Sequence, residues 1–194
     1  MVLIGLVGSK GSGKTTGAEY LTKQCDYVEK SFADPLKEAC KHLFLLDDHQ
    51  VYGTQEQKET PDPRWFDCTP RKILQYVGTD LLRNNLDNIM PGLGHEIFTR
   101  HFKLWYEAEI KKNPNIKVVI SDVRFHNEAE FIKKLGGFLI KIERPGSDNF
   151  DFHASEIELK SIQTDIIISN VKSINEYYQN LDTAINIFET KMNS

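Results

Sequence analysis

The sequence predicts one α/β domain, in which a parallel sheet of five strands lies between two layers of helices. Short apolar runs alternate with segments of helical periodicity, which is typical of parallel strands joined by right-handed crossovers. The runs are almost entirely apolar, as expected for strands buried on both faces. A glycine-rich segment follows the first run, at the edge where parallel sheets bind their ligands. These observations indicate a three-layer α/β/α fold.

The strands are expected at 2–7, 27–32, 117–121, 138–143 and 165–169. Several helix ends between them carry local signals. Asp34 and Thr69 each precede a proline, which combines a capping side chain with the residue favoured at the first helical position. Gly136-Gly137 is typical of a helix C-terminus. Ser173 and Glu176 have the spacing of a capping box, and the apolar stripe of the helix they open is expected to seal one face of the sheet.

The composition argues against several classes of protein. A net charge of −4 provides no overall positive field for nucleic acid, so we expect no nucleic-acid partner. No apolar stretch approaches the roughly 18 residues of a membrane span, and the N-terminal run is short for a signal peptide. The three cysteines lack the spacing of a zinc site or a disulfide framework. We therefore expect a cytoplasmic protein without a membrane partner, with its fold extending over the whole of 1–194.

The glycine-rich segment Gly8–Thr15 reads GSKGSGKT and fits the phosphate-binding pattern G-x-x-x-x-G-K-[ST] at every fixed position. Glycines allow backbone N–H groups to surround an anion, and the helix that follows adds its positive end. Lys14 is expected to reach the β- and γ-phosphates, and Thr15 to ligate Mg²⁺. The nucleotide contacts are expected from Gly8, Lys10, Gly11, Ser12, Gly13, Lys14, Thr15 and Thr16.

This loop predicts ATP and Mg²⁺ as the cofactors. ATP is favoured over GTP because the chain lacks the N/T-K-x-D segment with which regulatory GTPases read the guanine base. The motif alone leaves open a protein that binds nucleotide without catalysing a reaction.

Asp122 follows the third apolar run, where proteins with this loop place the acidic group that faces Mg²⁺ or the acceptor. Arg124 comes two residues later, and its planar fork can hold two phosphate oxygens. A structural ion pair at a strand end is the alternative interpretation of this pair. Lys37, Arg71 and Arg144 lie at turns near the same edge of the predicted sheet.

Two segments are predicted to move. Residues 46–68 contain glycine and prolines without sustained periodicity, and a loop of this length inside a compact domain is usually functional or mobile. We expect it on the acceptor side. Arg144 follows the fourth strand in a Pro/Gly turn, where it could swing over the phosphates on a lid that extends over 144–158.

Taken in order, these motifs resemble the deoxynucleoside monophosphate kinases of T-even and related bacteriophages. The resemblance covers nearly the whole chain, although 46–68 looks shorter than its counterpart in the T-even enzymes. Its residues are the phosphate loop, Ala33–Lys37, Arg71, Leu74–Leu81, Asn84-Asn85, Trp105, Asp122–Arg124, Glu128, Arg144–Gly146, His153–Glu156 and Asn170.

The resemblance implies a P-loop NTPase of the nucleoside monophosphate kinase type, in the cytoplasm of a phage-infected host cell. Its small-molecule substrate would be a deoxynucleoside monophosphate, with a homodimer left open. Trp105 offers a flat face for a base, with core packing as the alternative. Asn170 is implied on the nucleotide side. The acceptor contacts implied are Lys37, Arg71, Gly78, Thr79, Trp105, Asp122, Arg124, Glu128 and His153.

The expected reaction is in-line transfer of the γ-phosphoryl group of ATP, with Lys14, Asp122, Arg124 and Arg144 as the catalytic residues and with Thr15 and Asp122 at the metal. Three alternatives remain at this point. The acceptor could be a ribonucleotide or a phosphorylated metabolite, and the chain could be an ATP-dependent binding module. A nucleic-acid-processing protein is disfavoured by the acidic charge balance.

Overall fold

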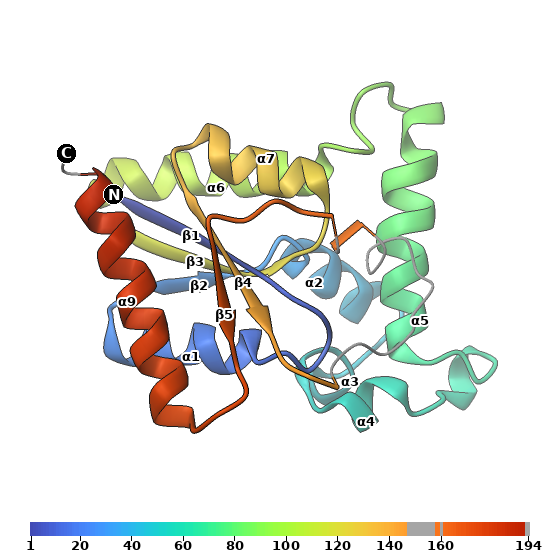
Figure 1. Ribbon diagram of the computed structural model, residues 1–194. Helices are drawn as coiled ribbons and strands as arrows, with labels where there is room; N and C mark the ends of the chain where they lie inside the picture. Colours follow the sequence, from blue (N-terminus) through green and yellow to red (C-terminus); the bar gives the residue numbers. More distant parts are fainter. Residues whose placement is uncertain (147–157, 160, 193–194) are drawn as a thin grey trace. The chain divides into compact units, whose positions relative to one another are not determined.

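A computed structural model describes residues 1–146, 158–159 and 161–192 (Figure 1). The chain divides into two compact units, of which the first comprises Met1–Phe32 with Phe102–Ser194 and the second comprises Ala33–His101. Each unit is described by itself below. Within the ranges given, no helix combines the length and the apolar character that crossing a bilayer requires. The prediction of one functional domain over 1–194 stays a prediction.

The first unit contains the sheet. Its strands are β1 (Val2–Val7), β2 (Val28–Lys30), β3 (Lys117–Val123), β4 (Phe138–Glu143) and β5 (Ile166–Ser169). All neighbours pair in parallel, and the strand order is β2-β3-β1-β4-β5. The predicted five-stranded parallel sheet is confirmed, and β1, which precedes the glycine-rich loop, is its central strand.

Three strands differ from their predicted bounds, among them β5, which begins at Ile166 instead of residue 165. β2 covers only part of 27–32, because it is an edge strand that pairs with β3 over Val28–Lys30 alone. β3 continues past the predicted end, since Val123 still pairs with Val7 after an irregularity in the register. Asp122 therefore lies inside β3 and does not follow it.

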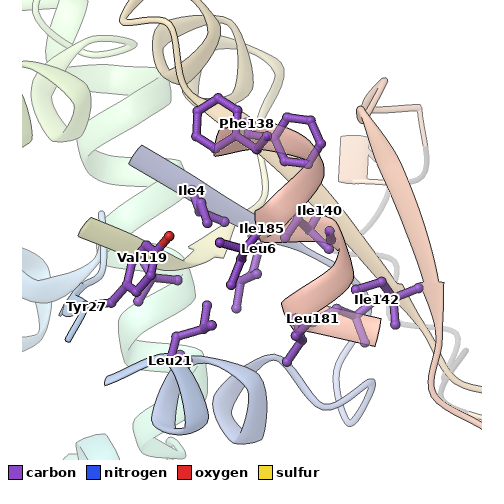
Figure 2. Packing of buried hydrophobic residues seen from close by; sticks show 14 of the residues in the cluster. Ile4, Leu6, Leu21, Tyr27, Val119, Phe138, Ile140, Ile142, Leu181 and Ile185 are labelled. Atoms are coloured by element: carbon purple, nitrogen blue, oxygen red, sulfur yellow. The ribbon is translucent and has the colours of Figure 1, made fainter. Parts of the chain in front are cut away.

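Helices cover both faces of the sheet. On one face, α1 (Lys14–Gln24) and α9 (Ile174–Met192) bury Leu21, Leu181 and Ile185 against strand residues (Figure 2). The strand side of this core consists of Ile4, Leu6, Val119, Phe138, Ile140 and Ile142. The prediction that the last helix seals one face is confirmed.

The opposite face follows from the alternation of side chains along β1. Position 5 of β1 faces the side of the sheet opposite to Ile4 and Leu6. A Cβ atom built on Gly5 would lie 2.7 Å from Cδ1 of Ile132. Ile132 belongs to α7 (His126–Lys134) and is fully buried. Helix α6 (Ile97–Lys112) begins in the second unit, and its Phe102 packs edge-on against Phe32. The predicted three-layer α/β/α arrangement is confirmed.

The second unit is helical. It contains α2 (Asp34–Leu43), α3 (Asp48–Tyr52), α4 (Gln55–Glu59) and α5 (Pro70–Gln75). Single turns lie at Pro63–Trp65 and Leu86–Asn88, and a π-helix, η2, spans Tyr76–Asn85. The helix predicted to begin after Thr69 therefore changes its winding after Gln75 and continues as η2 to Asn85.

The predicted helix ends have mixed outcomes. Thr69 caps α5, since its side chain accepts the N–H of Lys72 at 3.2 Å, and Ser173 accepts the N–H of Glu176 at 3.2 Å. Gly136 adopts φ +75° at the end of α7 as predicted. Asp34 is not a cap: Ala33 takes that position, and the Asp34 carboxylate lies 3.6 Å from Lys37 Nζ instead. Lys37, one turn later, competes for the Asp34 carboxylate oxygen that would otherwise cap the helix.

Residues 46–68 are not the structureless loop that their irregular periodicity indicates. Asp47 with Gln50 opens α3 as a complete capping box, and Thr54 with Gln57 opens α4 in the same way. Each box satisfies two backbone N–H groups within four residues, so helices too short to show a periodicity can still form. The predicted mobility of this segment stays a prediction. Of the predicted lid over 144–158, residues 147–157 lie outside the described residues.

Candidate nucleotide-binding site

The register of the sheet gathers the candidate residues of the first unit. Val7 pairs with Val123 on one side and Lys141 on the other, and Glu143 pairs with Ser169. The carboxyl ends of parallel strands lie at one edge of a sheet. This edge therefore carries the loop Gly8–Thr15, the end of β3 with Asp122 and Arg124, the exposed Arg144 after β4, and Asn170 after β5.

The glycines of the loop are required by its geometry. Gly11 and Gly13 adopt φ +80° and +110°, a backbone conformation that is unfavourable for residues other than glycine. A Cβ atom on Gly8 would lie 2.6 Å from the carbonyl oxygen of Ile142. Gly13 is the N-cap of α1 and has no side chain to cap the helix. The first N–H groups of α1 therefore face the loop, where an anion can accept their hydrogen bonds.

Lys14 is folded back over the loop. Its ammonium donates to the carbonyl oxygens of Gly8 at 2.6 Å and Ser9 at 2.8 Å. Phosphate oxygens could replace these acceptors without the lysine leaving the loop. Ser12 is fully buried, and its hydroxyl finds no hydrogen-bond partner within the described part of the chain. Of the other predicted loop contacts, Thr15 is exposed, while Lys10 and Thr16 are half-buried.

Two side chains from the end of the chain hold the loop from outside. Asn170 Nδ2 donates to the carbonyl oxygen of Ser12 at 2.9 Å, and the Tyr177 hydroxyl donates to that of Gly13 at 3.0 Å. Burial raises the pKa of Tyr177, so its hydroxyl stays a donor at neutral pH. The sequence assigned Tyr177 only to the apolar stripe of the last helix, because nothing local indicates which carbonyl its hydroxyl meets.

Asp122 holds the chain where it leaves β2. Its Oδ1 accepts the N–H of Phe32 at 2.7 Å, and its Oδ2 accepts the hydroxyl of Ser31. These contacts give Asp122 a structural role where the chain leaves β2, while the ion pair with Arg124 that was the alternative interpretation stays a prediction. The expected roles of Asp122 at the metal and the acceptor stay predictions.

Glu128 shapes the turn that carries Arg124. The carboxylate is 2% exposed, and its Oε2 accepts the N–H groups of Arg124 at 2.8 Å and Phe125 at 3.2 Å. Glu128 thus occupies the third position of α7, and its carboxylate accepts the N–H of the N-cap residue Phe125, which has no side-chain oxygen to complete a capping box. The predicted contact of Glu128 with the acceptor stays a prediction, and the geometry gives it a positioning effect on Arg124.

Trp105 lies in an aromatic cluster of the first unit. Its ring centroid is 5.5 Å from that of Phe102 and 6.4 Å from that of Tyr106, and Lys30 Nζ lies 4.8 Å from the ring centroid. This environment agrees with core packing, the alternative interpretation of Trp105. Its predicted contact with a base stays a prediction. His153, also expected to bind the acceptor, lies outside the described residues.

In the second unit, Lys37 and Arg71 both contact the segment 46–68. Lys37 Nζ lies 5.1 Å from the ring centroid of Tyr52 in α3. Arg71 Nε lies 3.1 Å from Glu59 Oε1, and its Nη2 donates to Gln55, with both partners in α4. The two cations expected at the acceptor phosphate are therefore attached to the segment predicted to lie on the acceptor side.

The π-helix η2 buries a polar face. Its buried residues are Gly78, Thr79 and Arg83. Arg83 is 5% exposed, and its guanidinium carbon lies 4.8 Å from the ring centroid of Phe98. Sequence reasoning selected Gly78 and Thr79 but missed Arg83. Its position four residues after Thr79, on the same helical face, is the signal that could have identified it.

The residues present fit a Mg²⁺ ion of the kind used in phosphoryl transfer. The described residues contain no group of three or more His, Cys, Asp or Glu side chains that could hold a metal by themselves. Mg²⁺ at such sites is usually held by one or two carboxylates together with substrate phosphates and waters. The exposed Thr15 beside the loop lysine and the half-buried carboxylate of Asp122 match this donor set.

Comparison with known proteins identifies the family. The sequence profile of the deoxynucleotide monophosphate kinases matches residues 67–181. A protein of Acanthamoeba polyphaga mimivirus assigned as a deoxynucleotide monophosphate kinase is 66% identical over 95% of this chain and 96% of its own length. The chain belongs to the deoxynucleotide monophosphate kinase family. The expected resemblance is confirmed, and the loop Gly8–Thr15, which precedes the matched range, lies within a chain aligned almost throughout.

Phage members of the deoxynucleotide monophosphate kinase family are less similar to this chain than the mimivirus protein is. The enzyme of Enterobacteria phage T4 is 26% identical over 60% of this chain and 45% of its own length. Among solved structures, a dephospho-CoA kinase from Campylobacter jejuni is 16% identical with a TM-score of 0.46, covering 96% of each chain. A score at this level establishes no common fold, so the fold assignment rests on the sheet and the glycine-rich loop.

Proposed function

We propose that this protein transfers the γ-phosphoryl group of ATP to a deoxynucleoside monophosphate and releases a deoxynucleoside diphosphate and ADP. The observation that carries the proposal is a complete phosphate-binding loop, with Lys14 held on the loop carbonyls, in a member of the deoxynucleotide monophosphate kinase family. The name of the mimivirus relative supports the acceptor class.

On the nucleotide side, the loop N–H groups and the start of α1 would bind the β- and γ-phosphates. Lys14 would exchange the carbonyl oxygens of Gly8 and Ser9 for phosphate oxygens and offset the negative charge on the transferred group. Arg124 and Arg144 lie at the same edge and would hold the phosphoryl oxygens in the transition state. The protein would contribute position and electrostatics, because the acceptor phosphate is already ionised and needs no general base.

Thr15 and Asp122 would hold Mg²⁺ together with the nucleotide. A bound Mg²⁺ would neutralise charge on the β- and γ-phosphates. Asp122 also keeps its contacts with Ser31 and Phe32, so it would keep the edge of the sheet in shape whether or not the metal is present.

On the acceptor side, Lys37 and Arg71 of the second unit would bind the 5′-phosphate of the deoxynucleotide. Arg71 pairs with Glu59, so an incoming phosphate would compete with a carboxylate for the same guanidinium. Thr79 and Arg83 on the buried face of η2 would contact the nucleoside or its phosphate. Thr79 and Arg83 belong to the same unit as Lys37 and Arg71.

The test is a product screen with the purified full chain. ATP and Mg²⁺ are incubated separately with dGMP, dTMP, dCMP, AMP and UMP, and the diphosphates are separated by ion-exchange chromatography. We expect a diphosphate from at least one deoxynucleotide. Transfer only to ribonucleotides would contradict the acceptor class, and ATP binding without transfer to any mononucleotide would contradict the kinase assignment.

A further inference from the structure

Adjacent carbonyl groups of the phosphate-binding loop are held by side chains more than 150 residues away. Asn170 Nδ2 lies 2.9 Å from the carbonyl oxygen of Ser12, at a sequence separation of 158 residues. The Tyr177 hydroxyl lies 3.0 Å from the carbonyl oxygen of Gly13, at a separation of 164 residues. These carbonyls belong to the peptide groups that join Ser12 to Gly13 and Gly13 to Lys14.

The orientation of these carbonyls determines where the loop N–H groups point. In a trans peptide the C=O and N–H bonds point in opposite directions. The Gly13 carbonyl also accepts the first helical hydrogen bond of α1, from the Gly17 N–H at 2.9 Å, and the Tyr177 hydroxyl adds a second donor to it. Holding the carbonyls of Ser12 and Gly13 on the side of Asn170 and Tyr177 therefore turns the N–H groups of Gly13 and Lys14 toward the other side. These N–H groups begin α1, where a phosphate is bound by unsatisfied donors and by the helix dipole.

Both donors are themselves held in place. Tyr177 belongs to α9 and is 2% exposed, so the packing of that helix holds its hydroxyl at the loop. The backbone N–H of Asn170 donates to the carbonyl oxygen of Glu143 at 2.7 Å, which extends the pairing of β5 with β4. The hydrogen bonds of Asn170 and Tyr177 therefore fix the loop carbonyls relative to the sheet and to α9.

The close approach depends on glycines. A Cβ atom on Gly13 would lie 2.4 Å from Asn170 Nδ2, and one on Gly17 would lie 2.4 Å from the Tyr177 hydroxyl. Gly17 is outside the phosphate-binding pattern, and the approach of Tyr177 accounts for a glycine there despite its low helix propensity.

We propose that Asn170 and Tyr177 are positioning residues that pre-orient the loop N–H groups for a polyphosphate without touching the nucleotide. The proposal rests on the proposed function only for the nature of the ligand. It assigns a role to Tyr177 and replaces the expected direct contact of Asn170 with an indirect one. A residue that acts through the loop affects every polyphosphate equally, whereas a residue that contacts the nucleoside affects ATP alone.

The experiment compares the binding of ATP and of inorganic tripolyphosphate, which has no nucleoside, by isothermal titration calorimetry in Mg²⁺. The variants are Asn170→Ala and Tyr177→Phe, with Tyr178→Phe as the matched control, since the Tyr178 ring stacks on Tyr20 and not on the loop. We expect Asn170→Ala and Tyr177→Phe to weaken both ligands by the same factor, about five- to tenfold, as for the loss of one hydrogen bond. Tyr178→Phe is expected to leave both unchanged.

A second route to the same contact does not remove a buried side chain. Gly17→Ala should raise helix propensity and keep the fold, while its methyl group displaces the Tyr177 hydroxyl. We expect Gly17→Ala to weaken tripolyphosphate binding about five- to tenfold in the wild-type background, and less than twofold in the Tyr177→Phe background, where the hydroxyl is already absent. Equal effects in both backgrounds would contradict the role of Tyr177.

The remaining outcomes separate this proposal from the proposed function. If Asn170→Ala weakens ATP and leaves tripolyphosphate unchanged, Asn170 contacts the nucleoside and the positioning role is wrong. If Asn170→Ala and Tyr177→Phe both bind tripolyphosphate as the wild type does, the proposal fails while the kinase assignment stands. If the wild-type protein binds neither ATP nor tripolyphosphate, the proposed function is wrong. The polyphosphate ligand that the positioning role assumes is then wrong as well.

Discussion

At the scale of single residues, hydrogen bonds that involve the backbone position two cationic residues of the nucleotide edge. Lys14 is attached to two loop carbonyls, and the peptide group of Arg124 is attached to the buried Glu128. In both cases the side chain that would act on phosphate belongs to a turn whose conformation is already determined. Substitution of these side chains should therefore alter chemistry more than folding.

Lys14→Ala is expected to abolish phosphoryl transfer, because it removes the cation of the phosphate-binding loop. A coupled assay of ADP release measures the effect. Lys23→Ala is the control, since Lys23 forms an exposed pair with Glu19 on the same helix. Transfer by Lys14→Ala at a rate near that of the control would mean that the loop does not hold the donor.

Arg124→Ala is expected to lower turnover by roughly 10³-fold or more, as for an arginine that stabilises the transferred phosphoryl group. The Arg124→Ala variant keeps the backbone N–H that donates to Glu128, so circular dichroism should show an intact fold. Arg124→Lys keeps the charge without the bidentate fork and should recover only part of the rate. A decrease of under about tenfold for Arg124→Ala would remove Arg124 from the mechanism.

At the scale of elements, the segment 46–68 is stabilised by one buried carboxylate. Asp62 is 4% exposed and accepts hydrogen bonds from Arg64 Nε at 2.9 Å, Arg64 Nη2 at 2.6 Å and Gln50 Nε2 at 2.8 Å. The Arg64 guanidinium and the Gln50 amide hold the pKa of Asp62 well below its usual range. Asp62 thus connects the end of the segment to α3, which contains Gln50.

This carboxylate should make stability depend on pH in a definite direction. A lowered pKa in the folded chain means that the contribution is present above the ordinary aspartate pKa of about 4 and is lost as pH falls toward the folded value. Asp62→Asn is therefore expected to lower the urea midpoint at pH 7, and the difference from the wild type should shrink below about pH 4. Asp67→Asn is the control, because Asp67 is exposed at φ +58°, a conformation that asparagine tolerates. A pH-independent difference would contradict the role of Asp62.

At the scale of the whole molecule, nucleotide binding at the loop should stabilise the folded chain. A ligand at about 100 times its Kd contributes roughly 2.7 kcal/mol, which corresponds to a rise in Tm of about 5–10 °C for a chain of this size. We expect this rise with ATP and Mg²⁺ in a thermal-shift assay, and little rise with adenosine, which lacks the phosphates. Equal shifts from ATP and adenosine would mean that the base, and not the loop, supplies the binding.

Much of the fold could be predicted because its signals are local. The caps at Thr69 and Ser173, the glycine end at Gly136 and the five apolar runs each depend on residues a few positions apart. The expectation of no regular structure was wrong for residues 46–68, where two short capping boxes were overlooked. The expected cap at Asp34 was also wrong, and its carboxylate lies near Lys37. The polar face of η2 was seen only in part, since Arg83 becomes a candidate only once the burial of that face is known.

The sequence by itself determined the first strand, the glycine-rich loop with its lysine and the family, because apolar runs, glycine spacing and motif order can be read directly from the chain. The central position of that strand came from the structure. Only the tertiary structure decided that Asp122 holds the end of β2, that Glu128 caps the turn at Arg124, and that Asn170 and Tyr177 hold the loop carbonyls. The contact between Asn170 and Ser12 joins residues 158 positions apart, so it exists only after the sheet has brought the ends of β1 and β5 to the same edge.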